Sequence, residues 1–231
     1  RTESNVWYLG NYMKTKAFLF DLDGTLIDTM PAHFKTWQLV VKEMGSPLEG
    51  EALMNQLYGN GAELMHRIVP GRTFTEEEAR AIVAAKEERY RNLYGNEITV
   101  LEGAREFLEL ALQKNIPMGI GTASNQANID FALDKLDLRR YLSAIVGADD
   151  VQLSKPHPET WLRLAAELNT PPEHCIVFED APKGVEAAQK AGMKAVAITG
   201  HFSANDFGEY ENILQIVPAL NVLNIDELLY L

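Results

Sequence analysis

The stretch that decides the fold reads Asp21-Leu22-Asp23-Gly24-Thr25-Leu26-Ile27-Asp28-Thr29. The apolar run Ala17–Phe20 precedes it and predicts a buried β-strand with two aspartates at its carboxyl end. Ligands of open α/β sheets bind at this end of the strands. If the strand continued to Asp23, its period of two would place both carboxylates on one side, where their repulsion would require a cation. The alternative for a bare Asp-x-Asp-Gly pattern is an Asx turn after the strand.

Length and composition indicate one sizeable domain, or a core domain with a small insert. The chain has 231 residues, of which 46% are hydrophobic and 23% are charged, as in ordinary globular proteins. The formal net charge of -12 opposes binding to nucleic acid or to an anionic membrane, so we expect neither as a partner. An anionic substrate would therefore need a metal or local cations at its site.

The cysteine content and the first residues of the chain are used to predict the cellular compartment of the protein. The single cysteine, Cys175, excludes an intrachain disulfide and favours a reducing compartment, so we expect a cytoplasmic protein. No apolar stretch approaches the length of a membrane span. Residues 1–12 lack the apolar core of a signal peptide, and Met13 begins what looks like a natural start. We interpret residues 1–12 as a tag or upstream extension, and we expect a monomer.

Residues 29–98 differ from the rest of the chain because their apolar residues recur at helical spacing. Acidic residues from Glu76 to Glu78 suit the start of a long helix, where they complement the helix dipole. No strand pattern interrupts this part of the sequence, so it predicts an all-α domain inserted after the first strand. The expected helices cover residues 34–44, 49–57, 62–69 and 73–93.

From residue 99 onward, strand patterns alternate with helix patterns. Such alternation predicts an α/β fold with a doubly wound parallel sheet, formed by residues 13–28 and 99–231. The expected strands cover residues 117–122, 144–146, 175–178 and 194–198. The expected helices cover residues 104–112, about 123–136, 155–168 and 181–191.

Polar residues lie at or just beyond the ends of four predicted strands. Singly, Thr122 or the Glu179-Asp180 pair could cap a helix, and Lys155 could be solvated. Parallel strands bring their carboxyl ends to one rim, however, and convergence there favours a common site. Carboxylates in such a cluster suit Mg²⁺, and a hydroxyl with an ammonium suits a phosphate. The residues concerned are Asp21, Asp23, Thr122, Lys155, Glu179 and Asp180.

This pattern resembles the haloacid dehalogenase (HAD) superfamily of phosphotransferases. The matching motifs are D-x-D-G-T-L-x-D-T, a hydroxyl after a strand, S-K-P, and V-F-E-D-A-P-x-G-V-E-A-A, and the match covers residues 16 to about 200. The helical insert is similar to that of the β-phosphoglucomutase-like branch. The resemblance implies a Rossmann-like core with a helical cap over residues 29–98, Mg²⁺ as cofactor, and a small phosphorylated metabolite as substrate.

The resemblance also implies a role for each residue of the rim. Asp21 would be the nucleophile that forms an aspartyl-phosphate, and Asp23 would be the general acid and base. Thr122 and Ala123 would bind the phosphate together with Lys155. Because the founding dehalogenases do not use the second aspartate in this way and need no Mg²⁺, Asp23 argues against dehalogenase activity. The metal ligands would be Asp21, the backbone carbonyl of Asp23, Glu179 and Asp180.

Two residues of the insert are candidates for contact with substrate, as is the loop at residues 58–63. His33 lies in a stretch similar to the first cap helix of the branch, and its alternative is a half-buried helix residue. Lys86 falls where the branch often has a cap lysine, although its charged neighbours slightly favour a solvated face. A Schiff base at Lys86 would instead make the enzyme a phosphonate hydrolase.

Two missing cations favour a hydrolase over a mutase. A β-phosphoglucomutase is expected to hold a second phosphate with a cap arginine and a lysine, and this chain has Ala62 and Asn125 there. Arg67 or His66 could substitute. We predict a Mg²⁺-dependent phosphohydrolase that cleaves a small phosphomonoester, such as a sugar phosphate, through an aspartyl-phosphate. The alternative is a β-phosphoglucomutase that interconverts β-glucose 1-phosphate and glucose 6-phosphate. A non-catalytic protein on this fold would have a broken motif, and none is broken.

Overall fold

The chain forms two compact units, which meet in sequence between Asp28 and Thr29 and between Ile98 and Thr99. The computed structural model describes residues 16–57 and 61–230. The predicted extension at residues 1–12 lies outside the described residues, as do positions 58–60 of the predicted substrate loop. The two segments on either side of the insert form the α/β unit, and the insert itself forms the helical unit.

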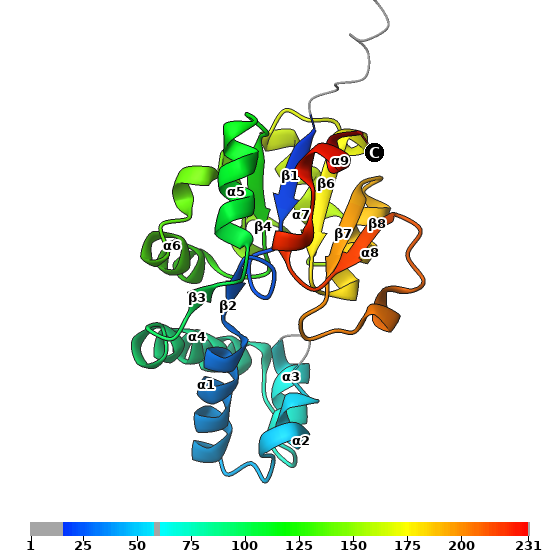
Figure 1. Cartoon of the computed structure of the whole chain (residues 1–231). Coiled ribbons are helices and arrows are strands. Elements are labelled where there is room, and N and C mark those ends of the chain that lie inside the picture. Colours follow the sequence, from blue (N-terminus) through cyan, green and yellow to red (C-terminus); the bar gives the residue numbers. More distant parts are fainter. Residues whose placement is uncertain (1–15, 58–60, 231) are drawn as a thin grey trace, which may run out of the picture. The chain divides into compact units, whose positions relative to one another are not determined.

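The α/β unit is built on a parallel six-stranded sheet with the strand order β5-β4-β1-β6-β7-β8 (Figure 1). This sheet confirms the predicted fold class. Its strands are β1 (Ala17–Phe20), β4 (Met118–Gly121), β5 (Ala144–Val146), β6 (Cys175–Glu179), β7 (Lys194–Ile198) and β8 (Ile213–Val217). A separate antiparallel pair, β2 (Ile27–Asp28) and β3 (Thr99–Val100), lies where the chain leaves and re-enters the unit.

Helices cover both faces of the sheet because the central strand β1 is apolar on both sides. Phe18 and Phe20 contact the ring of Phe107 in α5 (Ala104–Gln113), with centroids 5.8 and 6.2 Å away. Leu19 points the other way and belongs to the core cluster of Trp161 in α7 (Glu159–Glu167). Alternation along the strand thus fills two cores. Strand β1 is held from both faces, which fixes the position of the aspartate that follows it.

The start of α7 differs from the sequence prediction. The helix begins at Glu159 rather than at Lys155. Prolines at positions 156 and 158 explain the difference, because a residue that precedes proline is disfavoured in the helical region of backbone space. Lys155 therefore lies in a loop. The remaining helices of the unit are α6 (Gln126–Lys135), α8 (Pro182–Lys190) and α9 (Ile225–Tyr230).

The helical unit has a core of its own. Trp37, Val41, Leu53, Met65 and Ile68 are all buried and pack into one apolar cluster. The long helix predicted from the acidic residues begins at Glu76, and a capping box of Thr75 and Glu78 satisfies backbone donors at its start. The described residues of this unit form α1 (Met30–Glu43), α2 (Gly50–Met54), α3 (Gly61–Ile68) and α4 (Glu76–Leu93).

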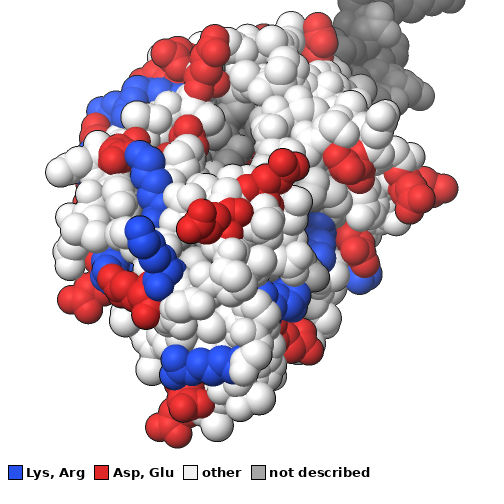
Figure 2. All heavy atoms as spheres, turned by 90° about the horizontal axis from the view of Figure 1, so that it is seen from below, with Lys and Arg blue, Asp and Glu red and all other residues white. Residues whose placement is uncertain are grey.

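Charges of both signs occur on the face of the molecule seen in Figure 2. Figure 2 shows acidic and basic side chains interspersed on one face, rather than gathered by sign. The formal net charge remains -12. Within residues 16–57 and 61–230, no helix is both long enough and apolar enough to cross a membrane.

The lone thiol offers a test of the core. Cys175 is 1% exposed at the start of β6, and burial raises its pKa to about 12. Since only the thiolate is nucleophilic, we expect the native protein to react with a disulfide reagent at pH 8 more slowly than the unfolded chain, by on the order of 10²-fold or more. Absorbance of the released thiolate, with and without guanidinium, measures both rates. Equal rates would contradict this packing.

Candidate active site

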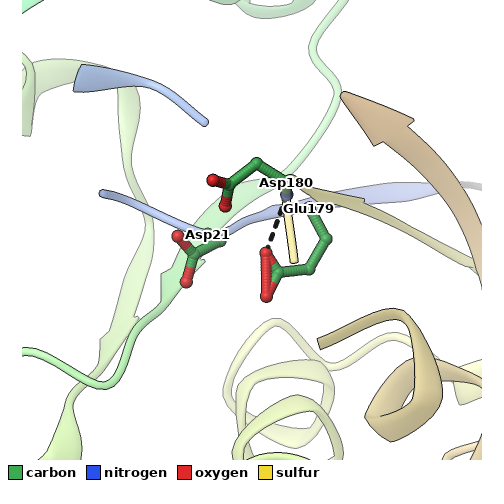
Figure 3. A group of neighbouring side chains, drawn as sticks. All are labelled: Asp21, Glu179 and Asp180. Atoms are coloured by element: carbon green, nitrogen blue, oxygen red, sulfur yellow. Dashed lines mark hydrogen bonds between the residues drawn. The ribbon is translucent and has the colours of Figure 1, made fainter. Parts of the chain in front are cut away.

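Three buried acids converge where strands β1 and β6 end (Figure 3). Asp21 follows β1, Glu179 is the last residue of β6, and Asp180 comes next. Each offers a carboxylate oxygen, and these oxygens all lie within 4.8 Å of one another. Glu179 is also braced locally, because the backbone N–H of Asp180 donates a hydrogen bond of 3.0 Å to its Oε2. The structure thus brings together three of the acids that the sequence places at the rim.

Asp23 does not continue the strand, so the condition under which strand alternation would place it on one side with Asp21 is not met. Strand β1 ends at Phe20, and the chain then folds into a tight turn. The backbone N–H of Ile27 donates to the carbonyl of Leu22 within this turn, at 3.1 Å. The Asp23 side chain is half-buried, and its Oδ2 accepts a hydrogen bond of 2.6 Å from Ser124 Oγ. Ser124 is a contact of a candidate site residue that the sequence analysis did not name.

Lys155 reaches the acids from its loop. Its Nζ lies 2.7 Å from Asp21 Oδ1 and 3.2 Å from Glu179 Oε1, and it donates to the carbonyl of Gly121 at 2.9 Å. The ammonium also lies 4.2 Å from the ring centroid of Trp161, a cation–π contact that the sequence did not indicate. The predicted convergence of a lysine and the acids is therefore present in the structure.

Burial and mutual repulsion set the protonation of the cluster. Burial first and the Glu179 charge second raise the pKa of Asp21 to about 8. The pKa of Glu179 and the pKa of Asp180 both rise to about 7, again chiefly through burial. Burial lowers the pKa of Lys155, but the charges of Asp21 and Glu179 outweigh it, and the net shift is upward. A positive charge placed among these three carboxylates is therefore stabilised.

Two glycines make room for the carboxylates. A methyl group at Gly184, in the first turn of α8, would overlap the Glu179 carboxylate. A side chain at Gly24, which has a φ of 91°, would overlap the carboxylate of Asp180. This all-oxygen set, crowded and buried, fits a hard divalent cation such as Mg²⁺. Asp21, Asp180 and Glu179 are the side chains that would hold it.

The predicted phosphate-binding segment follows strand β4. Thr122 is 2% exposed, and its backbone N–H donates to the carbonyl of Val146 at 2.9 Å. Its Oγ1 accepts a hydrogen bond of 3.1 Å from the backbone N–H of Ser124. Ala123, between the two, is exposed. The hydroxyl of Thr122 is thus held in place beside strand β1, to which β4 is paired.

The candidates of the helical unit form a cluster of their own. Lys86 is 2% exposed, and its Nζ contacts Glu87 Oε1 at 2.9 Å and His33 Nδ1. The rings of Trp37 and Tyr90 lie 5.3 and 5.7 Å from the same ammonium, and His33 stacks on Tyr90. The solvated face that was slightly favoured for Lys86 was therefore wrong, because aromatic rings and a carboxylate replace water around it.

Asn125, at one position of the mutase's cations, and His66, one of the possible substitutes, both make structural contacts. Asn125 caps α6, where its Oδ1 accepts a hydrogen bond of 3.0 Å from the backbone N–H of Asn128. His66 Nε2 accepts a hydrogen bond of 2.9 Å from the backbone N–H of Phe74. Asn125 is therefore a helix cap, and His66 is engaged with the backbone of its own unit.

Comparisons with known proteins agree with this geometry. Residues 15–192 match a family model described as a haloacid dehalogenase-like hydrolase. The chain is 32% identical to fructose-1-phosphate phosphatase YqaB of Escherichia coli over 81% of its own length and 98% of that protein. A HAD hydrolase of family IA from Entamoeba histolytica superposes with a TM-score of 0.85 at 27% identity, covering 93% of this chain and 97% of that one. A putative β-phosphoglucomutase from Thermotoga maritima superposes with a TM-score of 0.73 at 26% identity, covering 92% and 98%.

Proposed function

Because the chain belongs to the haloacid dehalogenase-like hydrolase family, we propose that it is a Mg²⁺-dependent phosphatase of small phosphomonoesters, with sugar phosphates as its main substrates. The observation that carries this proposal is the contact of Lys155 with both Asp21 and Glu179, next to Asp180. A buried carboxylate with a lysine on one oxygen, at the end of the central strand, is suited to attack phosphorus. Phosphoryl transfer requires such positioning and charge neutralisation above all.

The proposed reaction has two steps. Asp21 attacks phosphorus as the bond to the alcohol oxygen breaks, and Asp23 gives its proton to that oxygen. A water molecule then attacks the aspartyl-phosphate, Asp23 takes its proton, and the bond between Asp21 and phosphorus breaks. Lys155 and the Thr122 hydroxyl hold the nucleophile and the phosphoryl group during both steps. The enzyme returns to its starting state with one alcohol and one inorganic phosphate released.

The metal would be held by Asp21, Asp180 and Glu179, with the backbone carbonyl of Asp23 as a further proposed ligand. When bound, Mg²⁺ supplies positive charge that offsets the charge of the phosphoryl oxygens. Thr25 supports this ligand set, since its hydroxyl donates to Asp180 Oδ1 at 3.4 Å.

The substrate class rests on the relative from Escherichia coli, which is named as a fructose-1-phosphate phosphatase. The mutase remains the second candidate because a putative β-phosphoglucomutase shares the fold. The use of Asn125 as a helix cap favours the phosphatase, since a neutral cap offers no cation to a second phosphate. We propose that the helical unit, with its cluster of His33 and Lys86, selects the substrate.

A phosphate-release screen tests this proposal. The full chain is incubated with fructose 1-phosphate, glucose 6-phosphate, β-glucose 1-phosphate and pyrophosphate, with Mg²⁺ or with EDTA. Steady release from at least one sugar phosphate, abolished by EDTA, is the expected result. Formation of glucose 6-phosphate from β-glucose 1-phosphate without phosphate release would establish the mutase instead.

Metal binding is expected to stabilise the protein, and more so at high pH. The raised pKa values of Asp21, Glu179 and Asp180 mean that the metal-free folded state binds more protons than the unfolded state between about pH 4 and pH 8. The contribution of these groups to stability therefore falls as pH rises through that window. Mg²⁺ competes with the protons, so its effect grows along the same window.

At pH 8, Mg²⁺ at about 100 times its Kd is expected to raise Tm by roughly 5–10 °C. At pH 5.5 the rise is expected to be smaller. Thermal unfolding followed by circular dichroism measures both values, with NaCl at matched ionic strength as the control. An equal rise at both pH values would contradict the ligand assignment.

A further inference from the structure

The hydrogen bond between Ser124 and Asp23 joins two loops that are far apart in sequence. Ser124 Oγ donates to Asp23 Oδ2 at 2.6 Å, across a separation of 101 residues. One loop follows β1 and the other follows β4, and these two strands are paired in the sheet. The contact therefore arises from the sheet topology rather than from local sequence. Asp23, which accepts this hydrogen bond, is the proton donor in the proposed reaction.

Ser124 is itself held on both sides of its peptide backbone. Its N–H donates to Thr122 Oγ1 at 3.1 Å, and its carbonyl accepts from the N–H of Ala148 at 2.9 Å. A methyl group at Gly147 would come within 3.1 Å of that same carbonyl oxygen, so the neighbouring segment packs closely. The next residue, Asn125, caps helix α6. The backbone that carries the Ser124 hydroxyl is thus well anchored.

We propose that Ser124 is a positioning residue that fixes the rotation of the Asp23 carboxyl group, so that its proton is aligned with the departing oxygen. This inference rests on the proposed function. Proton transfer requires the acid to lie within hydrogen-bond reach of its target, and a carboxyl group that rotates freely spends less time there. The hydrogen bond between Ser124 and Thr122 further links the acid to the segment that binds the phosphoryl group.

The leaving group distinguishes this role from a structural one. The alcohol oxygen of a sugar phosphate must receive a proton as its bond to phosphorus breaks, whereas p-nitrophenolate is a stable anion and leaves without a proton. Removal of the Ser124 hydroxyl should therefore slow cleavage of fructose 1-phosphate and spare that of p-nitrophenyl phosphate. For both substrates, kcat/KM reports the step in which the alcohol or phenol departs.

The experiment measures kcat/KM of wild type, Ser124→Ala and Ser124→Thr with fructose 1-phosphate, phenyl phosphate and p-nitrophenyl phosphate. We expect Ser124→Ala to lower the value for fructose 1-phosphate by about 10-fold or more and to change that for p-nitrophenyl phosphate by less than about 3-fold. Phenyl phosphate should fall between them. Ser124→Thr keeps the hydroxyl and should restore the rate. Ser143→Ala, at an exposed serine before β5, is the control and should match wild type.

Equal losses with all three substrates, or no loss with any, would overturn the role of Ser124 while leaving the phosphatase intact. A wild-type protein that releases phosphate from none of them would overturn the proposed function and this inference together. Thermal unfolding of each variant shows whether a uniform loss reflects misfolding, which would also count against a role specific to the acid.

Discussion

Asp21→Asn is expected to slow phosphate release from sugar phosphates by a factor on the order of 10⁴ or more, with the fold intact. The amide has nearly the shape of the carboxylate, but it lacks the anionic oxygen that attacks phosphorus. Its Oδ1 can still accept the hydrogen bond that Lys155 donates to Asp21. The loss would therefore report chemistry rather than the loss of this contact. Coupled phosphate release at saturating substrate measures the effect.

Stability provides the internal control for this variant. Burial and Glu179 raise the pKa of Asp21, so the ionised carboxylate is unfavourable in the metal-free protein. Without Mg²⁺ at pH 8, the variant should unfold at the same temperature as wild type or higher, and Mg²⁺ should raise its Tm less. Asp226→Asn removes an exposed acid that pairs with Lys114 and should keep full activity. If Asp21→Asn kept a tenth of the wild-type rate, Asp21 could not be the nucleophile.

Gly184→Ala is expected to lower both stability and metal affinity. Alanine favours helices over glycine by about 1 kcal/mol, so propensity alone predicts stabilisation. The new methyl group would overlap Glu179, however, and the displaced carboxylate would leave Lys155 and the N–H of Asp180. We expect a net loss of about 1–3 kcal/mol of unfolding free energy and a fall of about 10–100-fold in Mg²⁺ affinity.

A double-mutant cycle isolates this clash from general damage to α8. In the background Glu179→Ala the obstacle is gone, so Gly184→Ala should become neutral or stabilising, in line with its helix propensity. Chemical unfolding of wild type, both single variants and the double variant gives the coupling energy. An equal cost of Gly184→Ala in both backgrounds would show that the glycine serves another purpose.

The sequence predicted those parts of the fold and site that follow from local pattern. The apolar run before Asp21 and the run Cys175–Phe178 form strands because both are short, apolar and buried on both sides. Their parallel pairing then brings the acids to one rim, as topology requires. Lys155 could be assigned to this rim from its motif, although its loop could not be distinguished from the start of a helix without weighing both neighbouring prolines.

Contacts made only by tertiary packing were not predictable. The ring of Trp161 near Lys155 comes from helix α7, and the hydroxyl of Ser124 reaches Asp23 from the loop after a neighbouring strand. Lys86 sits among acidic neighbours in sequence, which suggests solvent, and only packing against Trp37 and Tyr90 reveals its burial. Edge strand β8 was not predicted, because its alternation is weak and Pro218 follows it directly.

The short ladder of β2 and β3 bears on how such a chain could evolve. Asp28 pairs with Thr99, so the ends of a 70-residue insertion, Thr29–Ile98, start from backbone positions about 5 Å apart. An insertion that departs and returns at one point leaves the order and register of the main sheet unchanged. The parts of a gene that encode the α/β unit could thus be kept while the part that encodes this segment is replaced or lengthened. New substrate preferences could then arise without any change to the residues of the proposed active site.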